Sequence, residues 1–249
     1  DWPQNELRRL LVPLLNDSAR AVRTEIARVL SPINQGELND KDYKAYVRAY
    51  DELQKRFTDH LDRPESHLSL GIQAHEQGNL IEAKKRYHQA ISRDENFVPA
   101  RVNLADLTNR EGDKVQSEKL WREVTKLMPE WGDGFYSLGL LVAENPNRLK
   151  EAATILETAA KKMPEHDRVH YNLGISLWQL GEKAKGARFL IQAGKISPTN
   201  PEYPYGLAQF YAQDKNWRAA LPHAQRAAGL APSNRDVQRL LFLINSNLK

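Results

Sequence analysis

Apolar and small residues recur along most of this chain at one nearly constant interval. Leu followed by Gly or Ala occurs at Leu70, Leu104, Leu138, Leu173 and Leu207, so the successive steps are 34, 34, 35 and 34 residues. A fixed period of this length is typical of stacked helix pairs, in which each unit buries its apolar face against its neighbours. The pattern therefore predicts a helical array over about two-thirds of the chain.

Each unit has further small residues at constant offsets, namely Ala83, Ser117, Ala152, Gly186 and Ala220, followed seven positions later by Ala90, Val124, Ala159, Ala193 and Ala227. Small side chains let two antiparallel helices approach closely, and larger residues fill the gap to the next pair: Tyr87, Trp121, Leu156 and Leu190. Glycine tolerates the turn after the first helix (Gly78, Gly112, Gly181), and proline ends the second (Pro129, Pro164, Pro198, Pro232).

Other apolar stripes flank this array. Residues 4–15 and 19–30 have helical spacing, with Leu7, Leu10, Leu11, Leu14 and Leu15 on the first helix and Val22, Ile26, Val29 and Leu30 on the second. A helix of roughly residues 40–59 carries an aromatic stripe that we expect to pack against the first repeat: Tyr43, Tyr46, Val47, Tyr50, Leu53 and Phe57. Residues 235–249 should form a capping helix through Val237, Leu240, Leu241, Ile244 and Leu248, with Phe242 and Leu243 off that stripe.

The repeated residues resemble the tetratricopeptide repeat (TPR), a 34-residue pattern of Leu-Gly, Ala, an aromatic residue, Ala and Pro. We place five repeats at 64–97, 98–131, 132–166, 167–200 and 201–234, after a helix pair at 1–33 and a linker with a bridging helix at 34–63. The expected fold is all-α, a right-handed α-solenoid of antiparallel helix pairs. The fourth position departs from the Trp or Leu of the pattern, with His67, Arg101, Phe135, His170 and Pro204.

The first helix pair resembles a HEAT repeat in Leu14-Leu15-Asn16-Asp17 and Ala21-Val22-Arg23, which implies that Asp17 and Arg23 stabilise its turn and that further pairs precede it. In a wider resemblance, segments 17–23, 62–67 and 97–107 look like the C-terminal region of bacterial periplasmic multihaem cytochromes c with HEAT and TPR repeats. That resemblance implies a periplasmic location and haem c bound in a region before Asp1. It carries no haem residue into these 249 residues.

Composition restricts the chemistry. The absence of Cys excludes a disulfide framework, a Cys-ligated zinc site and Cys-x-x-Cys-His haem attachment within these residues, and no cofactor is expected in them. A net charge of +4 is too small to indicate a nucleic-acid partner, and no apolar run is long enough to span a membrane.

His166 and His170 lie four residues apart without a third ligand, so no metal site is expected. Neither a phosphate-binding loop nor a nucleophile motif occurs, so we expect no enzyme. Because Asp1 lies inside helical sequence and no Met precedes Met128, we expect a processed chain or a piece of a longer one.

A TPR stack lines its concave face with its first helices, at positions 2, 5, 9, 12 and 13 of each repeat. The predicted partner-binding groove takes its residues from positions 5, 9, 12 and 13: Ile72, His75, Val102, Asp106, Asn109, Arg110, Tyr136, Leu140, Tyr171, Ile175, Trp178, Tyr205 and Gln209. Tyr and Trp combine a large apolar area with a polar tip, which suits contact surfaces. The alternative is that the tyrosines only fill the space between adjacent first helices. No repeat has the Lys and Asn pair of a carboxylate clamp, which disfavours a C-terminal carboxylate as ligand.

These observations favour a non-catalytic scaffold that binds a protein or peptide. The cytochrome resemblance implies the docking domain of a periplasmic multihaem cytochrome c or redox assembly, whose partner includes a haem-binding domain of the same chain. The alternative is a cytoplasmic peptide-binding adaptor or assembly chaperone.

Overall fold

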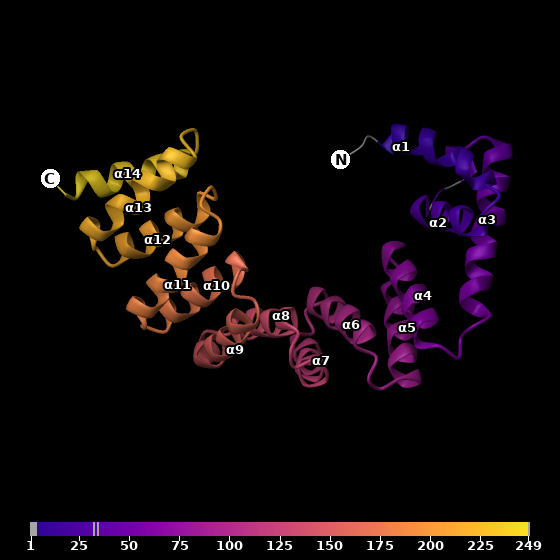
Figure 1. Ribbon diagram of the computed structural model, residues 1–249, viewed down its shortest axis with the longest axis horizontal. Helices are drawn as coiled ribbons and strands as arrows, with labels where there is room; N and C mark the ends of the chain where they lie inside the picture. Colours follow the sequence, from indigo (N-terminus) through magenta and orange to yellow (C-terminus); the bar gives the residue numbers. More distant parts are fainter. Residues whose placement is uncertain (1–3, 32, 34, 249) are drawn as a thin grey trace. The chain divides into compact units, whose positions relative to one another are not determined.

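The described part of the chain is helical. The computed structural model describes residues 4–31, 33 and 35–248, and in these residues α-helices and short 3-10 helices are joined by turns without any strand (Figure 1). The α-helices are α1 Gln4–Leu11, α2 Arg20–Val29, α3 Asp40–Thr58, α4 Pro64–Glu76, α5 Leu80–Arg93, α6 Val98–Arg110, α7 Lys114–Leu127, α8 Gly132–Ala143, α9 Leu149–Lys162, α10 Asp167–Gln179, α11 Lys183–Ile196, α12 Glu202–Gln213, α13 Trp217–Leu230 and α14 Arg235–Ser246. The 3-10 helices are η1 Val12–Asn16, η2 Gln35–Glu37 and η3 Pro146–Arg148. The predicted all-α class is confirmed.

The chain divides into two compact units. The first spans Asp1–Asp113 and ends after α6, and the second spans Lys114–Lys249 and begins with α7. The boundary therefore falls inside the second predicted repeat, between its two helices. Each unit is described by itself below.

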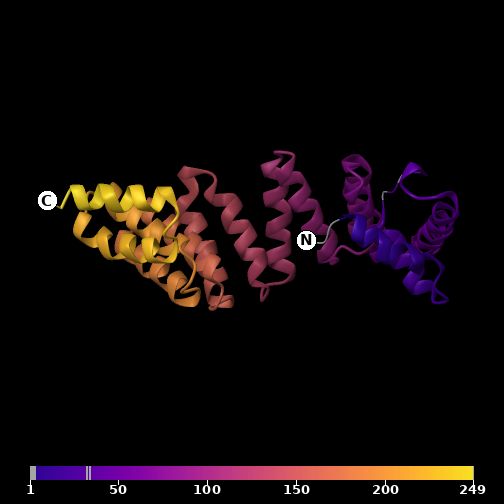
Figure 2. The ribbon, with the colours of Figure 1, turned by 90° about the horizontal axis from the view of Figure 1, so that it is seen from above.

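The second unit is a stack of antiparallel helix pairs. Helices α8 and α9, α10 and α11, and α12 and α13 pair within their repeats, while α9 packs on α10, α11 on α12, and α13 on α14 (Figure 2). From α7 to α14, each helix of this unit thus packs against the next one in the chain. This is the solenoid packing that the 34-residue spacing predicts.

The prolines and glycines predicted to end helices lie just after the helices. Helices α7, α9, α11 and α13 each end two residues before a proline, since Pro129, Pro164, Pro198 and Pro232 follow Leu127, Lys162, Ile196 and Leu230. Three glycines adopt positive φ after a first helix: Gly78 at 75°, Gly112 at 87° and Gly181 at 92°. In the fifth repeat Lys215 holds the same position at φ 57°, a conformation that is strained for a residue with a Cβ.

Small residues let the paired helices come into close contact. Gly174 of α10 and Gly186 of α11 face each other, and a Cβ on Gly186 would lie 2.7 Å from the Gly174 carbonyl oxygen. Gly139 is covered in the same way by Leu156 of α9, which is fully buried. The gap-filling role predicted for Leu156 and its counterparts is confirmed, because Tyr87, Trp121 and Leu190 are also at most 4% exposed.

The third repeat replaces the glycine turn with η3 and an ion-pair network. Arg148 of η3 donates to Glu118 of α7 at 2.7 Å and to Glu151 of α9 at 2.9 Å. Arg122 contacts the same two carboxylates, at 2.7 Å from Glu118. Hydrogen bonds from Arg148 and then from Arg122 lower the pKa of Glu118 to about 2, against the opposing effect of burial. The network therefore joins α7, η3 and α9 through groups that stay charged.

The N-terminal segment differs from the prediction of one helix over residues 4–15. Helix α1 ends at Leu11 and η1 follows, because Pro13 lacks the N–H and the space that an α-helix requires. The tighter 3-10 turn changes the direction of the leucines that it contains, so Leu15 is buried while Leu14 is exposed. Leu10 of α1 is also exposed. On α2, Ile26 is buried as expected but Val29 is exposed. The side chain of Leu7 lies outside the described residues.

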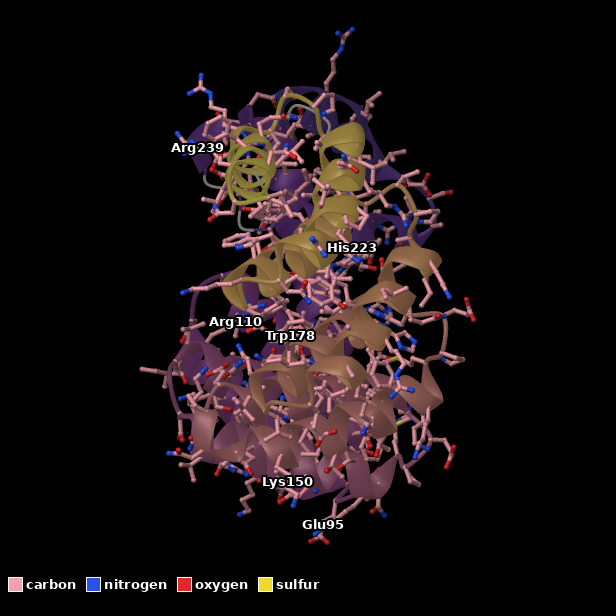
Figure 3. The ribbon with its side chains drawn as sticks, turned by 90° about the vertical axis from the view of Figure 1, so that its left-hand side faces the viewer. Glu95, Arg110, Lys150, Trp178, His223 and Arg239 are labelled. Atoms are coloured by element: carbon pink, nitrogen blue, oxygen red, sulfur yellow. The ribbon has the colours of Figure 1, made fainter. Side chains whose placement is uncertain are left out.

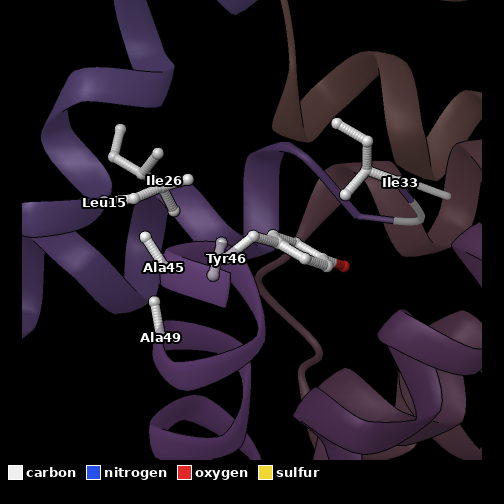
Figure 4. Close-up of a cluster of buried hydrophobic side chains, with 7 residues drawn as sticks. Leu15, Ile26, Ile33, Ala45, Tyr46 and Ala49 are labelled. Atoms are coloured by element: carbon white, nitrogen blue, oxygen red, sulfur yellow. The ribbon is translucent and has the colours of Figure 1, made fainter. Parts of the chain in front are cut away.

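The aromatic stripe of α3 packs mainly on the N-terminal helix pair, which corrects the expectation that it covers the first repeat. Figure 4 shows Tyr46 and Ala49 of α3 in one buried cluster with Leu15 of η1 and Ile26 of α2. Tyr50 is the stripe residue that reaches α4, where its hydroxyl accepts hydrogen bonds from Gln73 at 2.6 Å and from Gln77 further along α4. Val47 is exposed. Helix α3 is longer than α2, so only part of its aromatic stripe packs on the N-terminal helix pair.

The turn between η1 and α2 depends on Asp17 and Arg23. The Asp17 carboxylate accepts from the Ala19 N–H at 2.7 Å, and the Arg23 guanidinium donates to the carbonyls of Asp17 and Ser18 at 2.8 and 2.9 Å. Arg23 also pairs with Glu52 of α3 at 2.8 Å. Both residues therefore stabilise the turn, as the sequence resemblance implies, and Arg23 links it to α3.

Helix α14 covers the last repeat with Val237 and Ile244, which are at most 2% exposed. Leu240 and Leu241 are partly buried beside them. Leu248 was expected in this stripe but is exposed, because the helix ends at Ser246 before reaching it. Phe242 lies off the stripe as predicted and is 74% exposed.

Candidate functional site

In the second unit, three tyrosines occupy the fifth position of successive first helices: Tyr136 of α8, Tyr171 of α10 and Tyr205 of α12. All three are partly buried, and burial raises the pKa of each phenol, so each hydroxyl keeps its proton at neutral pH. A protonated phenol can both donate and accept a hydrogen bond. This row combines apolar ring surface with polar tips.

Two of these tyrosines also join neighbouring repeats. The Tyr136 hydroxyl accepts a hydrogen bond of 2.7 Å from Asn172 of α10, and its ring lies 5.6 Å from that of His166. The Tyr171 ring lies 5.1 Å from that of Tyr203, and its hydroxyl is so near Gly206 of α12 that a Cβ there would lie 2.6 Å away. Their side chains therefore fill the space between first helices, as the structural alternative predicts, while part of each stays exposed.

Tyr205 differs from the other two because its hydroxyl accepts from Gln209 of its own helix, at 3.0 Å. At the ninth position, Gln209 and Ile175 are partly buried and Leu140 is 37% exposed. Leu140 is thus an exposed apolar side chain on α8, one turn after Tyr136. We call the exposed parts of Tyr136, Leu140, Tyr171, Ile175, Tyr205 and Gln209 the first-helix face of the second unit.

Trp178 does not contribute to this face, which corrects its assignment as a groove residue. It is only 6% exposed, and its ring lies 5.3 Å from Phe210 and 5.2 Å from Tyr211 of α12. Figure 3 shows Trp178 drawn among the helices of the second unit. The twelfth position here points toward the next repeat, where Trp178 packs on two aromatic rings of α12.

An ion pair joins the second positions of two successive repeats, and it was not predicted from the sequence. Arg168 of α10 pairs with Glu202 of α12 at 2.8 Å, and its guanidinium lies 5.9 Å from the centre of the Tyr203 ring. The second position was among those expected to face inward, but no residue was selected from it. Opposite charges 34 residues apart were the available signal.

In the first unit, the predicted site residues lie on α4 and α6 and have a different chemistry. Asp106 and Arg110 of α6 are exposed, while Ile72, His75, Val102 and Asn109 are partly buried. Burial raises the pKa of Asp106, and the charges of Arg110 and His75 oppose this rise. The structure therefore brings His75, Asp106 and Arg110 together into a charged strip.

The histidines of the fourth position have a structural role. Nε2 of His67 lies 2.9 Å from the Leu61 carbonyl oxygen, and Nε2 of His170 lies 2.8 Å from that of Pro164. Each buried ring thus holds the turn that leads into its own repeat, and burial lowers the pKa of His67. Among the described residues there is no group of three or more His, Asp or Glu side chains that could hold a metal ion.

Residues 146–209, from η3 through most of α12, match the family model of the tetratricopeptide repeat. This segment, about a quarter of the chain, carries the tetratricopeptide repeat pattern. Tyr171, Ile175, Tyr205 and Gln209 of the first-helix face lie within the matched segment, as does the whole α10 and α11 pair, whereas Tyr136 and Leu140 of α8 precede it.

Solved structures with a similar fold include one that is described as a TPR protein. YrrB, described as a TPR protein with an unusual peptide-binding site, is 16% identical, covers 74% of this chain and 95% of its own, and has a TM-score of 0.64. The structure of MamA from residue 41 to its end, from Desulfovibrio magneticus RS-1, is 18% identical and has a TM-score of 0.63. The match covers 69% of this chain and 97% of that one. PilF of Pseudomonas aeruginosa is 19% identical and has a TM-score of 0.60. The match covers 74% of this chain and 84% of PilF. At these identities the likeness concerns the fold.

No described helix is long and apolar enough to cross a membrane.

Proposed function

We propose that this TPR chain is a non-catalytic scaffold that binds a peptide or protein segment on the first-helix face of its second unit. The observation that carries the proposal is the row of partly exposed tyrosines on three successive first helices, beside the exposed Leu140. Aromatic residues with polar tips are enriched at binding hot spots. The similar fold of YrrB, a TPR protein with a peptide-binding site, supports the same use of the array.

The face favours an apolar segment with amide or hydroxyl groups over a strongly charged one. Leu140 and Ile175 provide apolar area, and Gln209 and the phenols provide hydrogen bonds. The charges of Arg168 and Glu202 on the second position neutralise each other. An acidic C-terminal carboxylate would find no unpaired cation among these residues.

The test is selection of binding peptides from a displayed library, followed by affinity measurements with two variants. Leu140→Ser combined with Tyr205→Ala removes exposed area from the face while sparing Tyr136 and Tyr171, which join neighbouring repeats. Ile191→Ser is the matched control, since Ile191 lies on the second helix α11 and is 39% exposed, close to the 37% of Leu140. We expect at least a tenfold loss for the double variant and no change for the control. Equal binding by all three proteins would exclude this face.

For the biological setting, we propose a periplasmic redox assembly in which this chain docks a haem-binding domain. The support is the resemblance of segments 17–23, 62–67 and 97–107 to periplasmic multihaem cytochromes c that carry HEAT and TPR repeats. Haem c motifs of the form Cys-x-x-Cys-His upstream of Asp1, together with fractionation of the native protein into the periplasm, would bear this out. A start Met shortly upstream without a signal peptide would instead favour a cytoplasmic adaptor or assembly chaperone.

A further inference from the structure

A pocket of about 530 Å³ lies in the first unit where α3 ends and α4 begins. Its lining comes from the last turns of α3, the connecting turn and the first turns of α4: Arg56, Phe57, His60, Arg63, Glu65, Ser66 and Ser69. This volume is within the ~300–1,000 Å³ typical of small-ligand sites. None of these residues belongs to the first-helix face of the second unit.

The pocket has an excess of positive charge. Arg56 and Arg63 are exposed, and neither guanidinium forms an ion pair with any residue that the structure describes. Glu65 is the one carboxylate in the lining, and Asp59 and Asp62 of the same connection do not line the pocket. Two arginines therefore line the pocket with one glutamate, which favours an anionic ligand.

The start of α4 adds main-chain donors to this positive site. Arg63 is the N-cap residue, with φ −99° and ψ 136°, and no side chain caps the helix. The first N–H groups of an α-helix have no partner within the helix, and the helix dipole places partial positive charge there. Pro64 has no N–H, so the free donors nearest to the pocket are the amides of Glu65 and Ser66.

Ser66 provides an independent indication of a ligand. It is only 8% exposed and lines the pocket, yet its hydroxyl makes no hydrogen bond with any described residue. Ser69, one turn later, is already engaged, because its hydroxyl donates to the Glu65 carbonyl at 2.9 Å. The Ser66 hydroxyl is therefore free to donate to a group bound in the pocket.

We propose that this pocket binds the phosphoryl group of a phosphomonoester. A tetrahedral dianion has enough oxygens to accept from two guanidinium groups, the Ser66 hydroxyl and the α4 amides at once, whereas a planar carboxylate has only two. Phe57 provides an apolar wall for the organic part of the ligand. The proposal is independent of peptide binding on the first-helix face.

The experiment titrates the whole chain with inorganic phosphate, phenyl phosphate and acetate at constant ionic strength. Calorimetry measures affinity, and amide NMR signals of Glu65 and Ser66 report the place of binding. We expect saturable binding of both phosphates with shifts of these two amides, and at least tenfold weaker binding of acetate. Tighter binding of phenyl phosphate identifies an organic phosphomonoester, and equal affinities identify free phosphate as the source of the group. Acetate binding as strong as phosphate binding would overturn the phosphoryl assignment.

Variants of the pocket residues should either weaken or strengthen phosphate binding, depending on the residue that is changed. Arg56→Gln with Arg63→Gln should weaken phosphate binding at least tenfold, and Ser66→Ala should weaken it several-fold. Glu65→Gln removes the competing carboxylate and should strengthen binding several-fold, a gain that misfolding cannot produce. Arg218→Gln, at an exposed arginine of α13 outside the pocket, is the control expected to bind as the natural chain does. Unchanged binding by the double arginine variant, or the absence of saturable phosphate binding, would refute the site.

Discussion

Gly186→Ala tests whether the close approach of α10 and α11 limits the stability of the second unit. The added Cβ would lie 2.7 Å from the Gly174 carbonyl oxygen and 2.9 Å from the Trp178 backbone nitrogen. Both are main-chain atoms, so no side-chain rotation can relieve the overlap. The helices must separate by roughly 0.5–1 Å to restore ordinary contact distances.

The change in the free energy of unfolding combines a favourable change in helix propensity with an unfavourable change in packing. Ala is favoured over Gly inside a helix by about 1 kcal/mol, whereas forcing an extra methyl group into a packed interface costs about 1–3 kcal/mol, and more where the backbone must move. We therefore expect Gly186→Ala to lower the free energy of unfolding by about 1–2 kcal/mol. Separation of the helices also disturbs Trp178, which packs on Phe210 and Tyr211.

Gly194→Ala is the matched control within the same helix. A Cβ on Gly194 would meet only the Cβ of Tyr203, at 3.7 Å, which is an ordinary contact. This variant should gain about 0.5–1 kcal/mol from helix propensity alone. Urea unfolding followed by circular dichroism at 222 nm should separate the two variants by about 1.5–3 kcal/mol. If Gly186→Ala is as stable as Gly194→Ala, the backbone contact between α10 and α11 does not limit stability.

Two further predictions concern charge and turn geometry. Glu118→Gln should destabilise the second unit by about 1–3 kcal/mol at pH 7, because Arg148 holds the pKa of Glu118 near 2. This contribution is complete above pH 4.5 and is lost as the pH falls toward 2, so the difference between the urea midpoints of variant and natural chain should narrow at pH 3 and close only near pH 2; a constant gap would contradict the assignment. Lys215→Gly should stabilise by about 0.5–1 kcal/mol, since φ is 57° there, and Lys215→Ala is the control. Equal thermal midpoints for the Gly and Ala variants would show that positive φ costs nothing at this turn.

Several functional details could not be read from spacing. The row formed by Tyr136, Tyr171 and Tyr205 follows from the 34-residue interval, which places one residue of each repeat at the same position of its first helix. The interval did not reveal that Trp178 is buried, because burial depends on how closely the next repeat packs. It also did not reveal the pocket of Arg56 and Ser66, since those two residues belong to different helices whose angle is set by packing.

Residue order along the chain is enough to define the helical array, because its signals are local. A proline ends a helix through its own ring, as at Pro164, and a glycine permits positive φ through its own missing Cβ, as at Gly181. Packing in three dimensions assigns side chains to core, face or pocket. The stripe of α3 turned toward Leu15 and Ile26, and the His67 ring turned to a carbonyl of the preceding turn. Such choices depend on the free energy of contacts between residues distant in sequence, which periodicity does not encode.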